Sequence, residues 1–517
     1  MSHETDSPDR PAPARDLTAL RLMDLPVEGP AVSPDLPVTG LAVDSRQVRD
    51  GFVFVAIPGT KLDGAEFATY AIRQGAVAVV ATPEGVEKIR AGEGGLPIPV
   101  FLTETPRAKL AQMAAAFYGT QPAVIGAVTG TNGKTSTASF LAQIWQGAGE
   151  QAAVFGTTGV EGPDFTEPLA HTTPEPITLH GLLARLVERG VTHAAMEASS
   201  HGLAQHRLDG VRLSVAGFSN ISRDHLDYHA SFEDYRDAKL RLFADVLPPD
   251  GVAVINVRDG AMSDFWQAAE RRGQRIVSVG PGVECDLRVV EQRFRPDGQD
   301  VRLVWDGAER LVPLPLVGAF QAENVALAAA MALGSGTEAK AVFHALPGLH
   351  GVKGRMELVA KRQNGAAIYV DYAHTPDALR VALQALRPHC RGRLVVVFGA
   401  GGDRDPGKRP MMGKAASDHA DLAIVTDDNP RSEDPAKIRA AIMAACPEAD
   451  EIGGRAAAIL AGIDALKVSE DMLLIAGKGH EQGQEIAGEV LPFDDGDQAR
   501  ASVAALDGMQ AEIMGRQ

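Results

Sequence analysis

A glycine-rich segment that ends in a lysine, residues 128–136 (VTGTNGKTS), constrains this chain more than any other stretch of its sequence. The apolar run before it (123–128, AVIGAV) predicts a buried strand, and the apolar spacing of residues 137–145 predicts a helix. A glycine-rich turn from strand to helix lets backbone N–H groups converge on phosphate oxygens at a helix N-terminus. The segment therefore predicts an α/β domain that binds a nucleoside triphosphate, with Lys134 at the outer phosphates and Thr135 on Mg²⁺.

The segment is a variant of the strict pattern G-x-x-x-x-G-K-[ST], because Val128 stands where that pattern has glycine. An ordinary glycine-rich turn is the alternative explanation for such a match. The strand before the loop and the helix after it favour phosphate binding instead. The candidate nucleotide-binding residues of the loop are Gly130, Thr131, Asn132, Gly133, Lys134, Thr135 and Ser136.

Length and composition exclude several classes of protein. At 517 residues the chain is too long for one hydrophobic core, so three domains are expected. Its net charge of −17 argues against a nucleic-acid binder, which needs a basic face. Three widely separated cysteines indicate reduced thiols in a cytoplasmic protein. No apolar run approaches the roughly 20 residues of a membrane span, and the polar, proline-rich first residues lack the apolar region of a secretory signal.

Alternation of strand-like and helix-like segments predicts an α/β fold throughout, in three domains. We expect a disordered tail at residues 1–18 and a small α/β domain at 19–115. A central domain with a mainly parallel sheet follows at 116–350, and a Rossmann-like domain at 351–517. The turn-rich residues 346–354 are the candidate linker between the last two.

The strands of the last two domains are predicted as short apolar runs. Those of the central domain are 123–128, 192–196, 213–218 and 251–256, with a strand pair in 301–317 and a helix at 321–333. Those of the last domain are 366–370, 394–398, 422–425 and 472–475, with helices at 377–386, 408–417 and 435–445.

Polar clusters follow several of these strands, where open α/β sheets place ligand sites. Glu197 ends one strand and is followed by two serines and a histidine, which could hold Mg²⁺ and substrate oxygens, although a capping turn explains them equally well. Residues 219–229 (SNISRDHLDYH) carry a density of ionisable groups that is costly unless they meet a ligand or one another. Lys239, judged by composition alone, is a solvated helix lysine.

Three polar loops follow strands of the last domain: 399–405 (GAGGDRD), 427–431 (DDNPR) and 477–481 (GKGHE). Because they are expected at one edge of one sheet, they predict a shared pocket. Their arginines suit a carboxylate and their acidic side chains suit an ammonium group. Together the loops predict a site for a zwitterion.

The motifs of the chain run in the order found in Mur ligases: TGTNGKTS, AMEASSHGLAQHR, SNISRDHLDYH with Lys239 downstream, LVGAFQAENVALA, GRME, DYAHTPDAL, GAGGDRDPGKRP, DNPR and GKGHE. The sequence resembles this family from about residue 35 to 500, and more specifically the ligases that add the third peptide residue to the peptidoglycan precursor. Residues 44–59 (DSRQVRDGFVFVAIPG) resemble the UDP-binding N-terminal domain of that group.

The resemblance implies an ATP-dependent ligase that adds meso-2,6-diaminopimelate to UDP-MurNAc-L-Ala-D-Glu through an acyl-phosphate intermediate. It implies ATP and Mg²⁺ as cofactors and small molecules as the partners, and we expect a cytoplasmic monomer that binds no nucleic acid. The implied catalytic residues are Lys134, Glu197, His225 and Lys239. The implied metal ligands are Thr135, Glu197, His225 and a carbamylated Lys239 (N6-carboxylysine).

The resemblance also assigns binding residues. Besides the loop, the nucleotide would contact Asn256 and Asn324, with Arg355, Asp371 and His374 approaching when the last domain closes. The UDP-MurNAc-dipeptide would contact Ser45, Thr172, Thr173, Ser199, Gln205 and Arg207. Diaminopimelate would contact Arg404, Asp428, Asn429, Pro430, Arg431, Gly477 and Glu481. Lysine-adding relatives differ at the tetrad DNPR, and Arg431 can form a bidentate pair with the distal carboxylate that lysine lacks.

Two positions depart from the family pattern. His171 stands before Thr172 where the family often has asparagine, and Gln321 replaces a common asparagine. The alternatives are a lysine-adding ligase, another Mur or folylpolyglutamate-type ligase, and a non-catalytic nucleotide-binding module. DNPR and the N-terminal domain argue against the other ligases, and the joint presence of Lys134, Glu197, His225 and Lys239 argues against the module.

Overall fold

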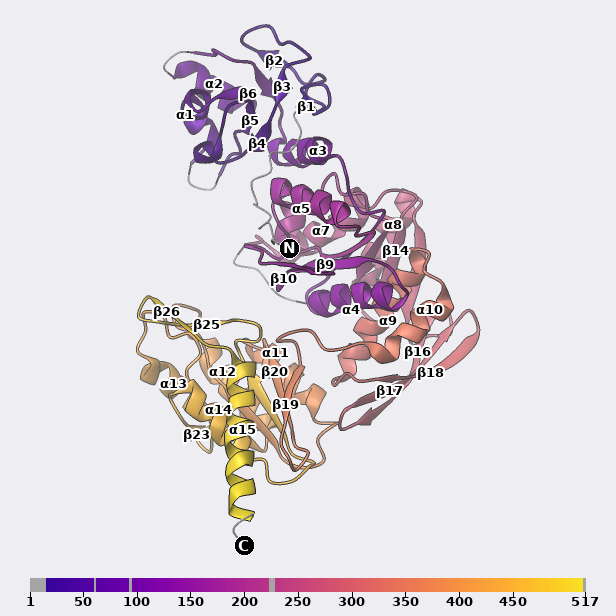
Figure 1. Ribbon diagram of the computed structural model, residues 1–517, viewed down its shortest axis with the longest axis vertical. Helices are drawn as coiled ribbons and strands as arrows, with labels where there is room; N and C mark the ends of the chain where they lie inside the picture. Colours follow the sequence, from indigo (N-terminus) through magenta and orange to yellow (C-terminus); the bar gives the residue numbers. More distant parts are fainter. Residues whose placement is uncertain (1–14, 60–61, 93–94, 223–227, 515–517) are drawn as a thin grey trace, which may run out of the picture. The chain divides into compact units, whose positions relative to one another are not determined.

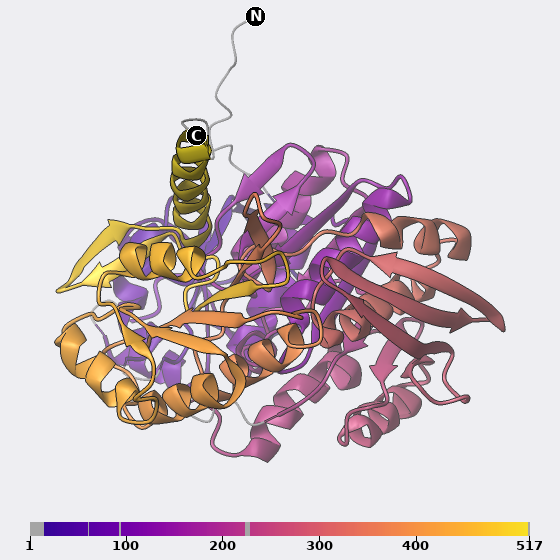
Figure 2. The ribbon, with the colours of Figure 1, turned by 90° about the horizontal axis from the view of Figure 1, so that it is seen from below.

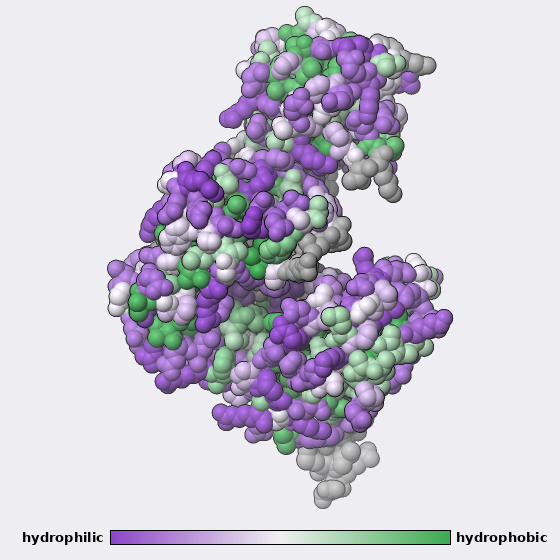
Figure 3. Space-filling model, turned by 180° about the vertical axis from the view of Figure 1, so that it is seen from behind, coloured by the Kyte–Doolittle hydropathy of each residue, from purple (hydrophilic) through white to green (hydrophobic). Residues whose placement is uncertain are grey.

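The computed structural model describes residues 15–59, 62–92, 95–222 and 228–514, with side chains as far as residue 508. It divides into two compact units. The first comprises Met1–Lys134, Gly149–Val277 and Gly334–Gly336, and the second comprises Thr135–Ala148, Ser278–Leu333 and Thr337–Gln517. Among the described helices, none combines the length and the apolar composition that a membrane crossing requires. Figure 3 shows that hydrophilic residues predominate on the visible face.

The first unit begins with a five-stranded sheet in the order β2-β7-β6-β5-β4 (Figure 1). Its strands are β2 (Val27–Glu28), β4 (Gly40–Ala42), β5 (Phe52–Val55), β6 (Ala76–Ala81) and β7 (Val100–Leu102). Its helices are η1 (Ser45–Gln47), η2 (Gly64–Phe67), α1 (Ala68–Arg73), α2 (Pro83–Ala91) and α3 (Pro106–Tyr118). Val53 and Val55 pack in the core beneath α3, and Phe54 packs in the core with α1 and α2, because successive strand residues point to opposite faces.

The expected disordered tail ends earlier than residue 18. Arg15–Asp16 form strand β1, which pairs with β3 (Pro37–Val38). Leu17 and Leu20 are fully buried in the core beneath α3. Residues 15–18 are therefore part of the folded chain, because two of them form β1 and Leu17 contributes to this core. Residues 1–14 lie outside the described chain.

The central strands of the first unit lie in the order β11-β10-β9-β12-β8-β13-β14-β15. They are β8 (Val124–Thr129), β9 (Ala152–Gly156), β10 (Gly159–Gly162), β11 (Phe165–Glu167), β12 (His193–Glu197), β13 (Val215–Phe218), β14 (Val252–Asn256) and β15 (Arg275–Gly280). The pairs between β9, β12, β8, β13 and β14 are parallel, whereas β10 and β11 are antiparallel additions. The four strands predicted from apolar runs are thereby confirmed.

The helices of this unit pack against the central strands, and together they form an apolar core that includes Ile125, Phe155, Leu183 and Phe265. They are α5 (Pro176–Glu188), α6 (Ser200–Ala204), α7 (Phe232–Arg241), the π-helical turn η3 (Leu242–Val246) and α8 (Met262–Arg272). The register pairs Glu197 with Val128 and Phe218 with Thr129. The loops after β8, β12 and β13 therefore leave the sheet at one edge.

The second unit contains helix α4 (Lys134–Gly147) except for its first residue, and the end of β15 from Ser278 onward. It also contains the antiparallel strands β16 (Leu287–Arg295), β17 (Gly298–Trp305) and β18 (Ala308–Leu314). Strands β17 and β18 confirm the predicted strand pair, which begins slightly earlier than expected, whereas β16 was not predicted. Helix α9 (Ala319–Gly334) matches the predicted alanine-rich helix. After α10 (Ala339–Ala345), the candidate linker includes a short helix, η4 (Leu346–Gly348), and buries Leu346 and Leu349, so much of it is packed.

The last sheet has the order β19-β20-β24-β21-β22-β23. Its strands are β19 (Glu357–Lys361), β20 (Ala367–Asp371), β21 (Leu394–Phe398), β22 (Leu422–Val425), β23 (Asp450–Glu451) and β24 (Met472–Ala476). All its pairs are parallel except β19 with β20. The register aligns Asp371 with Ala476 and Phe398 with Val425, so the loops after these strands share one edge. The Rossmann-like prediction is confirmed.

Helices cover both faces of this sheet (Figure 2). One core contains side chains of α11 (Pro376–Leu386), α12 (Lys408–His419) and α13 (Pro435–Met443), and the other those of α14 (Arg455–Asp464) and α15 (Asp495–Met514). Strand β24 alternates between them, with Leu474 in the first and Leu473 in the second. A hairpin, β25 (Gly483–Ile486) and β26 (Glu489–Pro492), completes the unit.

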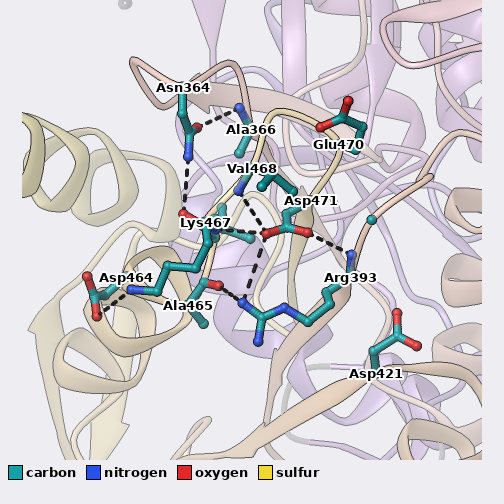
Figure 4. A network of polar contacts seen from close by, with 12 residues as sticks. Asn364, Ala366, Arg393, Asp421, Asp464, Ala465, Lys467, Val468, Glu470 and Asp471 are labelled. Atoms are coloured by element: carbon teal, nitrogen blue, oxygen red, sulfur yellow. Dashed lines mark hydrogen bonds and ion pairs between the residues drawn. The ribbon is translucent and has the colours of Figure 1, made fainter.

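A buried carboxylate orders the opposite edge of this sheet, where β21 and β24 begin (Figure 4). Asp471 accepts backbone N–H groups of Arg393 at 2.7 Å, Lys467 at 2.8 Å and Val468 at 3.1 Å. Burial alone would raise the pKa of Asp471, but these donors hold that pKa below its usual value. These hydrogen bonds fix the turns that precede the two central strands, β21 and β24.

Candidate functional site

The glycine-rich loop leaves β8 with a backbone that only glycine accommodates easily. Gly130 and Gly133 have φ angles of 151° and 83°. A Cβ atom at Gly130 would collide with the Ser219 hydroxyl and press on the Asn220 backbone. The loop and the segment after β13 therefore pack against each other along their backbones.

Hydrogen bonds hold this packing. The Thr131 backbone N–H donates to the Asn220 carbonyl at 2.8 Å, and the Asn132 N–H donates to the Asn220 side-chain oxygen at 3.0 Å. The Ser219 hydroxyl donates to the Asn132 carbonyl at 2.7 Å. The Thr131 hydroxyl lies 2.9 Å from the hydroxyl of Tyr235, a fully buried residue of α7. The loop conformation is thus built into the fold.

Two lysines meet at one carbonyl oxygen of the loop. Lys134 donates to the Gly130 carbonyl at 2.9 Å and to the Thr131 carbonyl at 2.8 Å, and Lys239 donates to the Gly130 carbonyl at 2.7 Å. Lys239 is 1% exposed and also lies over the Tyr235 ring. The composition-based expectation of a solvated Lys239 is wrong, because α7 turns this residue inward. Both lysine side chains therefore contact the same backbone oxygen of the loop.

Glu197 is almost completely buried at the end of β12. Its Oε1 accepts the Thr157 backbone N–H at 2.8 Å and the Thr157 hydroxyl at 3.2 Å. The Thr157 hydroxyl lies 3.1 Å from that of Thr172. Within the described residues, no three histidine, cysteine or acidic side chains form a metal-binding group. His225, which was predicted as a ligand, lies outside the described residues.

The residues predicted to hold the peptide form one network in the first unit. The Thr173 hydroxyl donates to the Glu197 carbonyl at 2.8 Å and lies 3.0 Å from the Ser199 hydroxyl. Arg207 donates to the Thr173 carbonyl at 2.7 Å and to the Gln205 side-chain oxygen at 2.8 Å. Burial lowers the pKa of Arg207 from its ordinary value. The capping-turn explanation also holds in part, because the Ser199 hydroxyl caps α6 by accepting the Gly202 N–H at 3.0 Å.

Other predicted residues of the first unit lie at buried positions. Ser45 is 7% exposed and begins η1. Asn256, at the end of β14, donates to the Ser219 carbonyl at 2.9 Å, so it supports the segment that packs on the loop. His171 is exposed, and nothing in the structure explains its departure from the family pattern.

In the second unit, Asn324 lies buried on α9 and donates to the Gln321 side-chain oxygen at 3.0 Å. The departure at position 321 therefore contacts a predicted nucleotide residue directly. Burial raises the pKa of Asp371, although Arg355 and the Met356 N–H, which donates at 2.7 Å, act in the opposite direction. The Arg355 guanidinium lies 4.6 Å from the centre of the Tyr372 ring.

His374 follows at the same sheet edge as Asp371. Loss of hydration lowers the pKa of its imidazole, although its hydrogen bond with the Tyr372 carbonyl at 2.9 Å acts in the opposite direction. Lys408, which donates to the His374 carbonyl at 3.2 Å, has its pKa lowered by burial, against the attraction of Asp428. The predicted nucleotide residues of this loop therefore adjoin the acceptor loops.

The three polar loops of the last sheet do meet, as the sequence predicted. Asn429 donates to Glu481 at 3.0 Å, and the fully buried Lys478 donates to Asn429 at 3.0 Å and to Glu481 at 3.1 Å. The Gly402 N–H donates to the Asn429 carbonyl at 2.9 Å, and Arg431 donates to the Gly402 carbonyl at 2.8 Å.

These three loops present side chains of both signs of charge. Asp428 is 8% exposed, and its Oδ2 is buried without a hydrogen bond to the residues that the structure describes. A Cβ atom at Gly477 would collide with this oxygen, so the backbone of Gly477, with φ 120°, approaches Asp428 closely. Arg404 is exposed on its loop, and Gly401 lies between its side chain and that of Arg431. An unsatisfied buried carboxylate oxygen suits an ammonium group.

Sequence reasoning missed several residues of these sites. Thr157 and Tyr235 carried no motif signal of their own. Lys478 stands inside the quoted GKGHE motif and could have been included. Gln484 and Glu485 lie shortly after that motif in the sequence, but only the folded hairpin brings them to the tetrad.

Residues 37–118, 128–332 and 354–479 match models described as the Mur ligase family catalytic domain, the Mur ligase middle domain, and the Mur ligase glutamate ligase domain. The chain is 49% identical over 494 residues to the UDP-N-acetylmuramoyl-L-alanyl-D-glutamate–2,6-diaminopimelate ligase of Bradyrhizobium diazoefficiens, covering 94% of this chain and 99% of that one. A solved structure of a ligase with the same name is 34% identical, with a TM-score of 0.72, and the match covers 95% of this chain and 99% of that one.

A folylpolyglutamate synthase of Mycobacterium tuberculosis, solved with ADP, is 19% identical with a TM-score of 0.59, covering 72% of this chain and 91% of that one. At this identity it shows a shared fold alone. The named ligases, in contrast, match nearly the whole chain at much higher identity. The chain therefore belongs to the Mur ligase family, in the branch whose members are named UDP-N-acetylmuramoyl-L-alanyl-D-glutamate–2,6-diaminopimelate ligases.

Proposed function

We propose that this protein joins an amino group of meso-2,6-diaminopimelate to the peptide carboxylate of UDP-MurNAc-L-Ala-D-Glu, with cleavage of ATP to ADP and phosphate, in peptidoglycan precursor synthesis. The observation that carries the choice of amino acid is that an acidic residue, Asp428, and a basic residue, Arg431, lie three positions apart in one loop. A carboxylate oxygen with no hydrogen bond to the described residues, together with a guanidinium, suits the ammonium and the distal carboxylate of one ligand. The names of the relatives support the same assignment.

The reaction requires positioning more than covalent help from the protein. A peptide carboxylate oxygen attacks the γ-phosphorus of ATP, and the bond to the β-phosphate oxygen breaks. The amine then attacks the acyl carbon, phosphate leaves with the electron pair, and the amine loses a proton. Two anions must first be brought together, so Lys134 and the backbone N–H groups of Gly130–Thr135 act mainly by neutralising charge.

Two of the metal ligands that the resemblance implies, Glu197 and Thr135, carry the oxygen donors that Mg²⁺ prefers. Glu197 supplies a buried carboxylate, Thr135 a hydroxyl at the start of α4, and His225 is a further ligand that the resemblance implies. The metal would supply neutralisation of phosphate charge. We propose that Lys239 is carbamylated: its neutral Nζ attacks CO₂, an N–C bond forms, a proton is released, and a cation becomes a carboxylate. The resemblance implies this modification, and the burial of Lys239 beside the phosphate loop supports it.

The other substrate contacts are proposed from the resemblance and supported by the network around Glu197. Thr172, Thr173, Ser199, Gln205 and Arg207 would hold the muramoyl dipeptide, and Ser45 would contact the uridine. Thr173 accepts the Ser199 N–H and bonds the Glu197 carbonyl, which holds the hydroxyl-bearing loops beside the carboxylate.

The remaining nucleotide contacts are assigned to Asn256, Asn324, Arg355, Asp371 and His374. Arg404, Asn429, Pro430, Gly477 and Glu481 complete the acceptor site around Asp428 and Arg431. We further propose that the enzyme acts as a monomer in the cytoplasm, on small molecules and without nucleic acid.

The test is an assay of phosphate release and product formation with UDP-MurNAc-dipeptide, ATP, and either meso-diaminopimelate or L-lysine. A site with a buried charged group commonly rejects an analogue that lacks its partner by about 10⁴-fold. We expect lysine to be a very poor substrate, and Arg431→Ala or Arg431→Lys to raise KM for diaminopimelate sharply with a small effect on KM for ATP. Equal use of lysine would contradict the assignment and favour the lysine-adding alternative.

A further inference from the structure

The β25–β26 hairpin is bonded to the DNPR tetrad along its first strand. The Gln484 side chain donates to the Asp428 carbonyl at 2.6 Å, and the Glu485 backbone N–H donates to the Asn429 side-chain oxygen at 3.0 Å. The Arg431 N–H donates to the Glu485 carbonyl at 3.0 Å, and the Ala487 N–H donates to the Arg431 carbonyl at 2.7 Å. The hairpin therefore shapes the loop that carries the charged groups of the acceptor site.

Arg431 needs this support because its backbone is strained. Its φ angle is 54°, a left-handed conformation that a residue with a side chain seldom adopts. The bonds on either side of Arg431, to Glu485 and from Ala487, fix this conformation and with it the direction of the Arg431 side chain. Such strain persists only where surrounding contacts over-determine the conformation.

Glu485 also fixes the plane of the guanidinium. Its Oε2 accepts the Arg431 Nε–H at 3.1 Å, while Nη1 donates to the Gly402 carbonyl at 2.8 Å. A guanidinium has five N–H donors in a planar fork. These are the two side-chain hydrogen bonds of Arg431 to the described residues. They use the Nε hydrogen and one of the two Nη1 hydrogens. Three donors on the Nη1 and Nη2 side remain for a ligand, which suffices for a bidentate pair with a carboxylate.

We propose that Glu485 is a positioning residue that determines acceptor specificity: it orients the Arg431 fork toward the distal carboxylate of the amino-acid substrate. This inference rests on the proposed function. Without Glu485, the guanidinium could rotate about its last bonds, and ordering it would then reduce the free energy of binding. The effect falls on ligands with a distal carboxylate, whereas lysine makes no such pair.

Three variants of the purified enzyme test this role. Glu485→Ala removes the acceptor, and Glu485→Gln keeps an acceptor oxygen without the charge. Glu489→Ala is the matched control, because Glu489 is an exposed glutamate on the opposite strand of the same hairpin. For each we measure kcat and KM for meso-diaminopimelate and for ATP, the rate with L-lysine, and the melting temperature.

We expect Glu485→Ala to raise KM for diaminopimelate at least about tenfold, the scale of one hydrogen bond to a charged group, with kcat and KM for ATP within about twofold of wild type. The preference over lysine should fall by a similar factor. Glu485→Gln should recover most of the lost affinity, and Glu489→Ala should behave as wild type. A merely structural role predicts instead a lower melting temperature with no selective change in KM for diaminopimelate.

The outcome separates this inference from the proposed function. If wild type uses diaminopimelate and Arg431→Ala impairs that use, but Glu485→Ala has wild-type KM values, Glu485 does not position Arg431 and the further inference alone is wrong. If wild type does not prefer diaminopimelate, or if Arg431→Ala leaves its KM unchanged, the acceptor assignment itself is wrong.

Discussion

The Gly130 carbonyl oxygen accepts bonds from two lysines of different origin, one from the phosphate loop and one from α7. At this residue scale, Lys134 is the group whose role the loop defines most directly. Its side chain folds back over two loop carbonyls, so it is held beside the backbone N–H groups expected to bind phosphate. Lys239 is held more deeply and contacts the same loop.

Lys134→Ala should lower kcat at least about a hundredfold, because a positioned charge in a closed site is lost. The melting temperature should change little, since Lys134 is only part-buried. Steady-state phosphate release with all three substrates measures the loss. Lys414→Ala, which removes an exposed lysine of α12, is the control and should be fully active. Near-normal turnover in the Lys134 variant would exclude the phosphate-loop assignment.

Lys239→Ala should be nearly inactive if the carbamate ligates Mg²⁺. Enzyme depleted of CO₂ should lose activity and regain part of it with bicarbonate, and Lys239→Glu should recover some turnover by supplying a carboxylate on a shorter side chain. Intact-protein mass spectrometry under mild conditions, with and without bicarbonate, gives an independent readout. An enzyme that keeps full activity without the added mass would contradict the carbamate.

At the element scale, α15 is attached to the last sheet by two buried ion pairs. Arg455 bonds Asp495 at 2.7 and 2.6 Å, and it also donates to the Ala476 carbonyl at 3.1 Å and the Asp427 carbonyl at 3.4 Å. Arg362 bonds Asp507 at 2.8 Å and donates to the Ile463 carbonyl. The first pair thus holds the residues just before Gly477 and Asp428, whereas the second lies along the helix away from those loops.

Asp495→Asn and Asp507→Asn should both destabilise the protein by about 3–5 kcal/mol, because each leaves a buried guanidinium without its charge partner. Only Asp495→Asn should also raise KM for diaminopimelate, since only Arg455 bonds the ends of β22 and β24. Urea denaturation and steady-state kinetics at a temperature where both variants are folded make the comparison. Equal kinetic effects of the two variants would refute this division of roles.

Helix α5 carries a buried histidine that makes the folded state less stable at acid pH. His180 is 1% exposed, and burial lowers its pKa from 6.5 to about 4. Because the folded pKa lies below the unfolded one, the unfolded chain binds the proton more readily. The stabilisation is complete above pH 6.5 and is lost as pH falls from 6.5 to about 4.

His180→Leu should therefore reduce the loss of unfolding free energy between pH 7 and pH 5 by about 2 kcal/mol. Urea denaturation at the two pH values, followed by circular dichroism, measures the difference. The matched control is His171→Leu, which makes the same replacement at an exposed histidine of the same unit. An identical pH dependence in wild type and His180→Leu would show that His180 does not contribute.

At the scale of the whole molecule, the phosphate loop belongs to the first unit and the acceptor loops to the second. The proposed reaction should couple ATP cleavage to the amine acceptor. We expect phosphate release to require UDP-MurNAc-dipeptide and to rise at least about tenfold when diaminopimelate is added, because the acyl phosphate is consumed only by the amine. ATP hydrolysis that ignores both substrates would favour a nucleotide-binding module or a different reaction.

Local sequence patterns determined much of this fold. Buried parallel strands are continuous apolar runs, so β8, β12, β13, β14, β20, β21, β22 and β24 could be predicted from neighbouring residues alone. Their polar loops fall at strand ends, where the sheet topology places ligand sites. That rule predicted that the DNPR and GKGHE loops lie side by side, and the hydrogen bond from Asn429 to Glu481 confirms it.

Only the tertiary structure decided which distant residues meet. Lys239 has the local sequence of a surface helix residue, yet packing of α7 buries it against Gly130, which lies 109 residues earlier in the chain. The pair of Arg455 with Asp495 and the hairpin that holds Arg431 likewise carry no repeating signal. Apolar periodicity records how one element faces the core, because burial acts on every turn or alternate residue. A single polar contact between elements depends on their packing, which no local pattern contains.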